Sequence, residues 1–378
     1  MADPLEISGD CAPGYEPVRD AFAENFASRG DVGASVAMVV DGETVVDLWG
    51  GCRDAGRKAR WQRDTLVNIW STTKGVTALC IAMLVDRGLL AYEKLVADYW
   101  PEFGAHGKGG VTVAMLMSHQ AGLCSFTDPA RVEDFYDIEG AASRLAASAP
   151  IWAPGSRSGY HAITVGILAD ALCRHVDGRD LRTFVAEELV VGQGLDISIG
   201  LNAHHEARVA EMIAPEAMST TTIMSDLNPS QLLAFTNPVL DPLLPNMSGW
   251  RGASIPSANG FATACALATL YGALAYDRII GGREIIRAKA LRSATTEQWA
   301  GVDEVLGVPA RWSCGFLLNT DGIYGDSPDA FGHSGWGGAF AFADPSRRMG
   351  LAYTMNRMGR DLVGDPRNVA LVAAAMAI

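Results

Sequence analysis

The chain has 378 residues, 49% of them hydrophobic and 19% charged, which is enough to bury a large core. Its net charge of −13 and isoelectric point near 5.0 disfavour nucleic acid as a partner, because phosphates attract basic surfaces. The most apolar stretch, residues 261–276, is too short to span a bilayer. We find no secretory signal and no C-x-x-C pair among the seven Cys, so we expect reduced thiols and a cytoplasmic location.

In chain order, the first predicted element is an amphipathic helix over residues 15–28. Two apolar runs, residues 34–40 and 44–49, flank Asp41-Gly42 and predict a β-hairpin. The middle of the chain is mostly helical, with predicted helices over residues 72–86, 111–117, 162–175, 181–190 and 262–276. A long irregular stretch rich in Pro, Asn and Ser precedes the last of these helices, over about residues 215–259.

Strand patterns return late, over residues 314–319, 339–343 and 350–356, before a closing helix over 367–378. Because both chain ends carry strands and a helix, we predict an α/β (α+β) fold. One antiparallel sheet is built from both ends and flanked by the terminal helices, with a mainly helical domain inserted. The predicted division is residues 1–70 and 300–378 for the sheet domain and 71–299 for the helical domain, with the active site at the junction.

A candidate nucleophile lies in the chain's single S-x-x-K, Ser71-Thr72-Thr73-Lys74. If Ser71 begins a helix, Lys74 lies one turn on, on the same face. The positive end of the helix dipole and the apolar neighbours both disfavour the charged ammonium. A neutral Lys beside a Ser is a workable base and nucleophile, and the Ser71 N–H at the helix end is free to bind an oxyanion. The alternative interpretation is that Ser71 only caps the amino end of the helix.

Three further motifs follow S-x-x-K along the chain. Residues 116–123 (LMSHQAGL) resemble an L-L-x-H-x-x-G-L segment, Pro154-Gly155 precedes Tyr160 as in P-G-x-x-x-x-Y, and residues 332–335 (GHSG) resemble the H-x-G variant of K-T-G. Together with S-x-x-K, these motifs make the chain similar to the serine β-lactamase and penicillin-binding protein superfamily. Within it, the chain resembles the class C-like, family VIII carboxylesterases.

The resemblance implies a β-lactamase-like fold and a set of roles, with no metal and no cofactor. Ser71, Lys74 and Tyr160 would be catalytic, Tyr160 carrying protons as a phenolate favoured by nearby Lys74. The backbone N–H groups of Ser71 and Trp336 would form the oxyanion hole. His333 and Gly335 would face the substrate, while the family's His, here His119, is expected to be buried and hydrogen-bonded. Two Trp side chains, Trp152 and Trp250, are candidate pocket residues.

Two departures from the family pattern bear on the substrate. The family's Y-x-N is Tyr160-His161-Ala162, so a carboxamide is missing, and the Lys of K-T-G is His333. Both changes weaken recognition of an anionic acylamino-lactam and leave acyl transfer intact. We therefore expect a carboxylesterase for small or hydrophobic esters, with room for weak β-lactamase activity.

Three alternatives stay open at this point. The chain could be a β-lactamase or DD-peptidase, it could hydrolyse linear amides, or it could be a catalytically inactive binding module of the same fold. The expected partner is a small-molecule ester, with neither nucleic acid nor membrane. The oligomeric state and the natural ester do not follow from the sequence.

Overall fold

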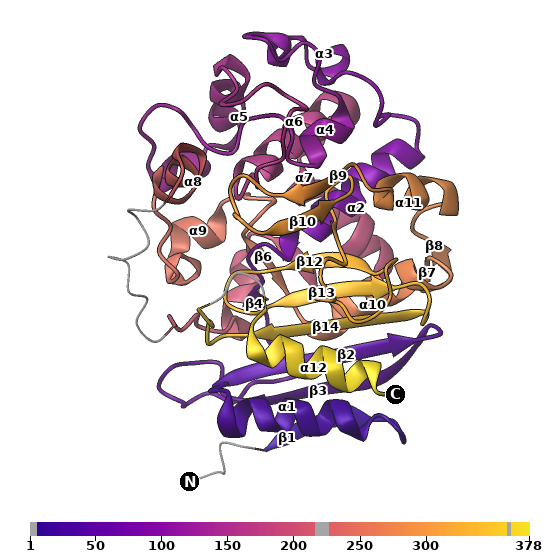
Figure 1. Ribbon diagram of the computed structural model, residues 1–378. Helices are drawn as coiled ribbons and strands as arrows, with labels where there is room; N and C mark the ends of the chain where they lie inside the picture. The colour runs from indigo at the N-terminus through magenta and orange to yellow at the C-terminus, as the bar shows by residue number, and fades with distance from the viewer. Residues whose placement is uncertain (1–5, 216–226, 361–363) are drawn as a thin grey trace.

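The computed structural model describes residues 6–215, 227–360 and 364–378. Its main feature is a nine-stranded antiparallel sheet in the order β1-β3-β2-β14-β13-β12-β11-β10-β9 (Figure 1). The first three strands are β1 (Ile7–Cys11), β2 (Gly33–Val40) and β3 (Glu43–Gly51). The others are β9 (Trp299–Val302), β10 (Pro309–Trp312), β11 (Leu317–Leu318), β12 (Phe331–Ser334), β13 (Phe340–Asp344) and β14 (Met349–Met355). Both chain ends therefore build one sheet, which confirms the predicted fold class.

The predicted hairpin is β2–β3. Asp41 and Gly42 have positive φ angles of 52° and 84°, the conformation that a tight turn matching the strand twist requires. The predicted strands 339–343 and 350–356 correspond to β13 and β14. The prediction for residues 314–319 was too long, because only Leu317–Leu318 pairs with neighbours. Strands β1 and β9 carry no clear alternation, and β10 alternates over only four residues, so all three escape the sequence pattern. Strand β12 follows only from the family resemblance.

Helices cover both faces of this sheet. Figure 1 shows α1 (Glu16–Ser28) and α12 (Pro366–Met376) side by side in front of the sheet and α10 (Ala264–Ala275) behind it. α10 packs on β2, β13 and β14. The α10 backbone comes close to the sheet where Gly272 faces Gly350 of β14. The space is so small that a Cβ on Gly350 would overlap the backbone nitrogen of Gly272. The predicted helices at both chain ends and over residues 262–276 are confirmed.

The helical region begins with α2 (Thr73–Asp86), whose residues 73–84 are all buried. It continues with α3 (Val96–Tyr99), α4 (Val113–Met117), α5 (Ile138–Ala147), α6 (Thr164–Asp177), α7 (Leu181–Val185), α8 (Pro229–Thr236), α9 (Ser248–Gly252) and α11 (Ala288–Thr295). Helix α7 is shorter than predicted, since Ala186–Val191 continues as a π-helix. In the described part of the chain, no helix combines the length and apolar character that crossing a membrane requires.

Part of the predicted irregular stretch, residues 216–226, lies outside the described residues. The described remainder contains the two short helices α8 and α9. A small three-stranded sheet, β4 (Val67–Asn68), β6 (Gly260–Ala262) and β5 (Ile197–Ile199), joins the helical region to the segment before α2. A two-stranded ribbon, β7 (Ile279–Ile280) and β8 (Arg283–Glu284), follows α10. The division at residues 70/71 and 299/300 stays a prediction.

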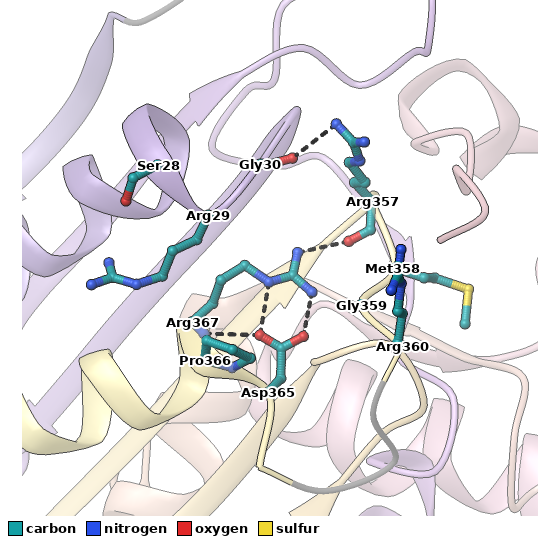
Figure 2. Close-up of a pocket in the computed structure, with 10 residues that line it drawn as sticks. All are labelled: Ser28, Arg29, Gly30, Arg357, Met358, Gly359, Arg360, Asp365, Pro366 and Arg367. Atoms are coloured by element: carbon teal, nitrogen blue, oxygen red, sulfur yellow. Dashed lines mark hydrogen bonds and ion pairs between the residues drawn. The ribbon is translucent and has the colours of Figure 1, made fainter. Parts of the chain in front are cut away.

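A buried ion network ties α12 to the sheet, and Figure 2 shows its Arg367–Asp365 pair. The Arg367 guanidinium donates to Asp31 at 2.9 Å and to Asp365 at 2.6 Å, and the Tyr353 hydroxyl donates to Asp31 at 2.7 Å. Arg367 also donates to the carbonyl of Gly337 at 2.7 Å. Removing one partner of such a buried pair costs about 3–5 kcal/mol. The network therefore fixes the turn that follows β12, which borders the site described next.

Candidate active site

Ser71 lies on a sharp strand-to-helix turn. Strand β4 pairs with β6, the N–H of Ile69 still donates to the Gly260 carbonyl at 2.9 Å, and α2 begins only two residues after Ser71. Between them, Trp70 has a φ of 44°, which costs roughly 1–3 kcal/mol for a bulky side chain. Its ring packs on Trp250 and Trp336, with centroids at 5.3 and 5.0 Å. That packing holds the strained turn and with it the Ser71 hydroxyl.

Lys74, in the first turn of α2, is surrounded by three oxygen atoms. Its Nζ lies 3.0 Å from Ser71 Oγ, 2.6 Å from the Ala162 carbonyl and 2.9 Å from the Ser257 carbonyl. Burial lowers the pKa of the amine well below its usual value of 10.5. A neutral amine has two N–H groups and one lone pair, and the carbonyls can only accept. The lone pair is therefore left for the Ser71 hydroxyl.

Tyr160 completes the group around Ser71. It is 7% exposed, and the Lys74 amine lies 4.7 Å from its ring centroid. Burial raises the pKa of the phenol above its ordinary value, and an interaction with the Ser71 side chain offsets part of this rise. The expectation of a phenolate was wrong, because a neutral Lys74 offers no charge to stabilise one. Tyr160 is a protonated phenol at neutral pH.

The segment around His119 supports the backbone of Tyr160. The Gly159 N–H donates to the His119 carbonyl at 3.0 Å, and the His161 N–H donates to His119 Nδ1 at 3.2 Å. His161 in turn accepts from the Leu123 N–H at 3.0 Å through Nε2. Burial lowers the pKa of both imidazoles, that of His161 to about 4. The prediction of a buried, hydrogen-bonded His119 is confirmed.

His333 on β12 is a neutral acceptor rather than a cation. It is 2% exposed, and its Nδ1–H donates to the Ser334 carbonyl at 2.9 Å. Burial lowers its pKa to about 3, so Nε2 carries a lone pair, and this atom has no partner within the described residues. The ring centroid lies 6.2 Å from that of Tyr160. A direct contact between His333 and the substrate stays a prediction.

The end of β12 packs against the turn that carries Ser71. A Cβ on Gly335 would overlap the carbonyl oxygen of Ile69, and Thr72 Oγ1 donates to the Ala339 carbonyl at 3.1 Å. Among the described residues, no protein acceptor is bonded to the N–H of Ser71 or of Trp336. Two unused N–H donors on neighbouring segments are what an oxyanion hole requires. Their assignment to that role stays a prediction.

Both predicted pocket Trp residues, Trp152 and Trp250, are buried against other residues of the protein. Trp152 is 7% exposed and packs on Gly159 and on the ring of His161, at 6.0 Å. Trp250 is fully buried, and its indole N–H donates to Asn68 at 2.9 Å. Their contact with substrate stays a prediction.

Sequence analysis missed the acceptors around the Lys74 amine. They are backbone carbonyls, of Ala162 and Ser257, and no motif records a carbonyl. It also missed Asp303, a buried acid that accepts the N–H of Tyr160 at 2.8 Å. Asp303 belongs to none of the motifs found in the sequence.

Comparison with known proteins agrees with this geometry. A family model described as Beta-lactamase matches residues 18–374, and the chain belongs to this family. Over 94% of this chain and 84% of the relative, it is 35% identical to the esterase/β-lactamase LipL of Mycobacterium tuberculosis. Two crystal structures superpose with a TM-score of 0.93 at 45% identity, covering 98% of this chain and 99% of theirs. One is a family VIII carboxylesterase and the other a penicillin-binding protein homologue from Caulobacter crescentus.

Proposed function

We propose that the protein is a carboxylesterase that forms an acyl-enzyme at Ser71. The observation that carries this proposal is the Lys74 amine, 3.0 Å from Ser71 Oγ, with two carbonyls occupying both of its N–H groups. Burial keeps this amine neutral, so it acts as a base without a separate carboxylate. The family membership and the esterase named among the relatives support the same activity.

The reaction follows from the three side chains. Ser71 Oγ attacks the ester carbonyl carbon while its proton passes to the Lys74 amine, and the N–H groups of Ser71 and Trp336 bind the oxyanion. The bond to the alkoxy oxygen then breaks, and Tyr160 donates its phenolic proton to that oxygen while it recovers one from Lys74. In the second half, water attacks the acyl carbon and gives a proton to Tyr160, which passes its own proton to Lys74. The bond between the acyl carbon and Ser71 Oγ then breaks, the carboxylic acid leaves, and Lys74 returns the proton to Ser71 Oγ.

The preferred substrate is a neutral ester with small or hydrophobic groups. The nitrogen bases around Lys74 and Tyr160 favour their neutral forms, because burial lowers the pKa of Lys74, His119, His161 and His333. None of these four described bases offers a cation to a substrate carboxylate, and desolvating an unpaired charge is costly. A neutral ester carries no such penalty.

A second candidate is weak β-lactamase activity. A 35% identical relative is an esterase/β-lactamase, and the acyl-transfer machinery is the same for both reactions. The missing carboxamide at Ala162 and the neutral His333 place this activity below ester hydrolysis. An inactive binding module is disfavoured, because Ser71, Lys74 and Tyr160 are together in one site.

Intact-mass analysis after treatment with a fluorophosphonate tests the nucleophile directly. We expect one adduct on the wild-type protein and none on Ser71→Ala. Lys74→Ala and Tyr160→Phe should lower kcat on a nitrophenyl ester by at least about 100-fold, the scale of general acid–base catalysis. Unchanged labelling of Ser71→Ala would refute the proposal. A cytoplasmic location, and a small ester rather than nucleic acid or membrane as the partner, also stay proposals.

A further inference from the structure

Asp303 lies next to Tyr160 and takes part in no step described above. Its side chain is fully buried. Oδ1 accepts the N–H of Tyr160 at 2.8 Å and those of Val305 and Leu306 at 2.9 Å. Oδ2 accepts the indole N–H of Trp312 at 3.1 Å. Oδ2 also lies 3.4 Å from the Ser158 hydroxyl, which in addition lies 3.1 Å from the Ser118 carbonyl. Ion pairs between described residues do not include Asp303, so these donors offset the cost of burying this acid.

Trp312 links the same carboxyl group to the ring of Tyr160. The two aromatic systems stack with centroids 5.6 Å apart and an interplanar angle of 11°. The His119 ring packs edge-on against both, at 5.1 Å from Tyr160 and 4.6 Å from Trp312. Asp303 therefore holds the main chain of Tyr160 with one oxygen, and with the other it holds the indole on which the phenol rests.

We propose that Asp303 is a positioning residue for the Tyr160 hydroxyl. This inference rests on the proposed function, in which Tyr160 passes a proton between Lys74 and the leaving group. Asp303 touches neither substrate nor the reacting atoms, and acts only by fixing where the phenol oxygen lies relative to Ser71. Misplacing a reacting group by about 1 Å is enough to lower a rate by about 100-fold.

Asp303→Asn changes the Oδ2 side of the carboxyl group, which accepts from Trp312 at 3.1 Å and lies 3.4 Å from the Ser158 hydroxyl. The Asn carbonyl oxygen can still accept the three backbone N–H groups. Its NH₂ group would face the indole N–H of Trp312, and because both groups are donors, this hydrogen bond would be lost. We expect kcat on nitrophenyl butyrate to fall by roughly 10- to 100-fold, with little change in KM. The matched control is Glu304→Gln in the same turn, which pairs with Arg157 at 3.2 Å and should leave kcat unchanged.

A double-mutant cycle with Tyr160→Phe separates positioning from general damage to the fold. If Asp303 acts through the phenol, Asp303→Asn should have almost no further effect on kcat once the hydroxyl is gone. The same fold-loss in both backgrounds would overturn the positioning role and leave the esterase proposal standing. A Tyr160→Phe variant with native kcat would instead overturn the proton-carrying role, and the inference about Asp303 with it.

A second variant covers the case in which Asp303→Asn does not fold. Trp312→Phe removes the same hydrogen bond from the other side and keeps an aromatic ring beside Tyr160. Taken through the same cycle with Tyr160→Phe, it should lower kcat only while the Tyr160 hydroxyl is present. An equal loss in both backgrounds would again overturn the proposal.

Discussion

Replacing Ala162 with Asn tests why this site should prefer esters to lactams. Where the family's Y-x-N supplies a carboxamide, Ala162 presents a methyl group, and its carbonyl is occupied by the Lys74 amine at 2.6 Å. His333, in place of the K-T-G Lys, is neutral, and its one N–H donates to the Ser334 carbonyl. Two polar anchors for an acylamino-lactam with a carboxylate are therefore absent or altered.

The magnitude follows from the hydrogen bonds that are lost. One hydrogen bond to a charged group contributes about 1.5–3 kcal/mol, which is about 10- to 150-fold in kcat/KM. Two such losses lower kcat/KM for a penicillin or cephalosporin by roughly 10²–10⁴. A neutral ester uses neither anchor. We therefore expect kcat/KM for nitrophenyl butyrate to exceed that for nitrocefin by at least about 100-fold.

The assay compares the two substrates across three proteins. Ala162→Asn should raise nitrocefin kcat/KM by up to about 150-fold, the value of one anchor, and change ester turnover little. Ala162→Leu is the matched control, since it has a similar size and no amide. Comparable wild-type values for ester and nitrocefin would refute the esterase preference. An equal gain in the Leu variant would show that pocket shape, not the amide, matters.

Two further predictions concern the nucleophile and its turn. Ser71→Ala should lower kcat by roughly 10⁴–10⁶, measured with a nitrophenyl ester, and a residual rate near the wild-type value would exclude Ser71 as nucleophile. Gly335→Ala places a methyl group against the Ile69 carbonyl. This overpacking should lower the free energy of unfolding by about 1–3 kcal/mol, so both the melting temperature and kcat should fall. Gly252→Ala meets open space and serves as the control, and equal effects of the two substitutions would contradict the packing argument.

The sequence predicts this fold well where a local signal coincides with the tertiary environment. Asp41-Gly42 specifies a hairpin through φ angles that few residues adopt. The run that forms α10 is apolar almost throughout and is buried on nearly all sides, and α12 buries Leu371, Val372 and Ala375 on one face. Strands β9 and β10 have no such local signal. They are four residues long, and β9 is largely exposed, so their pairing depends on the neighbouring strand rather than on their own pattern.

The same reasoning explains which parts of the site could be predicted. Ser71 and Lys74 are one helical turn apart, so their proximity is local and a spacing rule finds it. The carbonyls of Ala162 and Ser257 reach Lys74 from 88 and 183 residues away, and Asp303 reaches Tyr160 across 143. Contacts at such separations exist only after folding. The error in the phenolate prediction has the same origin, because burial decides the charge on Lys74 and Tyr160.

Protonation of Lys74 should inactivate this site without unfolding the protein. When Lys74 takes a proton, its ammonium has three N–H donors, and Ser71 Oγ, Ala162 O and Ser257 O lie around it as three acceptors at 3.0, 2.6 and 2.9 Å. The protonated form therefore fits without rearrangement, but the lone pair that activates Ser71 is lost. Activity should rise with pH through the lowered pKa of Lys74, and its loss on the acid side should be reversible.

Protonation of His161 is a different event. Its Nε2 accepts the Leu123 N–H and its Nδ1 donates to the Gly159 carbonyl, so an added proton on Nε2 would meet a donor. The folded pKa is about 4 against 6.5 ordinarily, so the unfolded state binds more protons between these values. Stability is complete above pH 6.5 and falls as pH drops towards 4, by about 3 kcal/mol from this residue. Titrating kcat/KM and circular dichroism in parallel separates the two protonations. His161→Gln should remove its own share of the structural transition and leave the activity profile unchanged, while the lowered pKa values of His119 and His333 maintain the rest of that transition. If activity and structure declined together, with both unaffected by His161→Gln, the separation of the two protonations would be wrong.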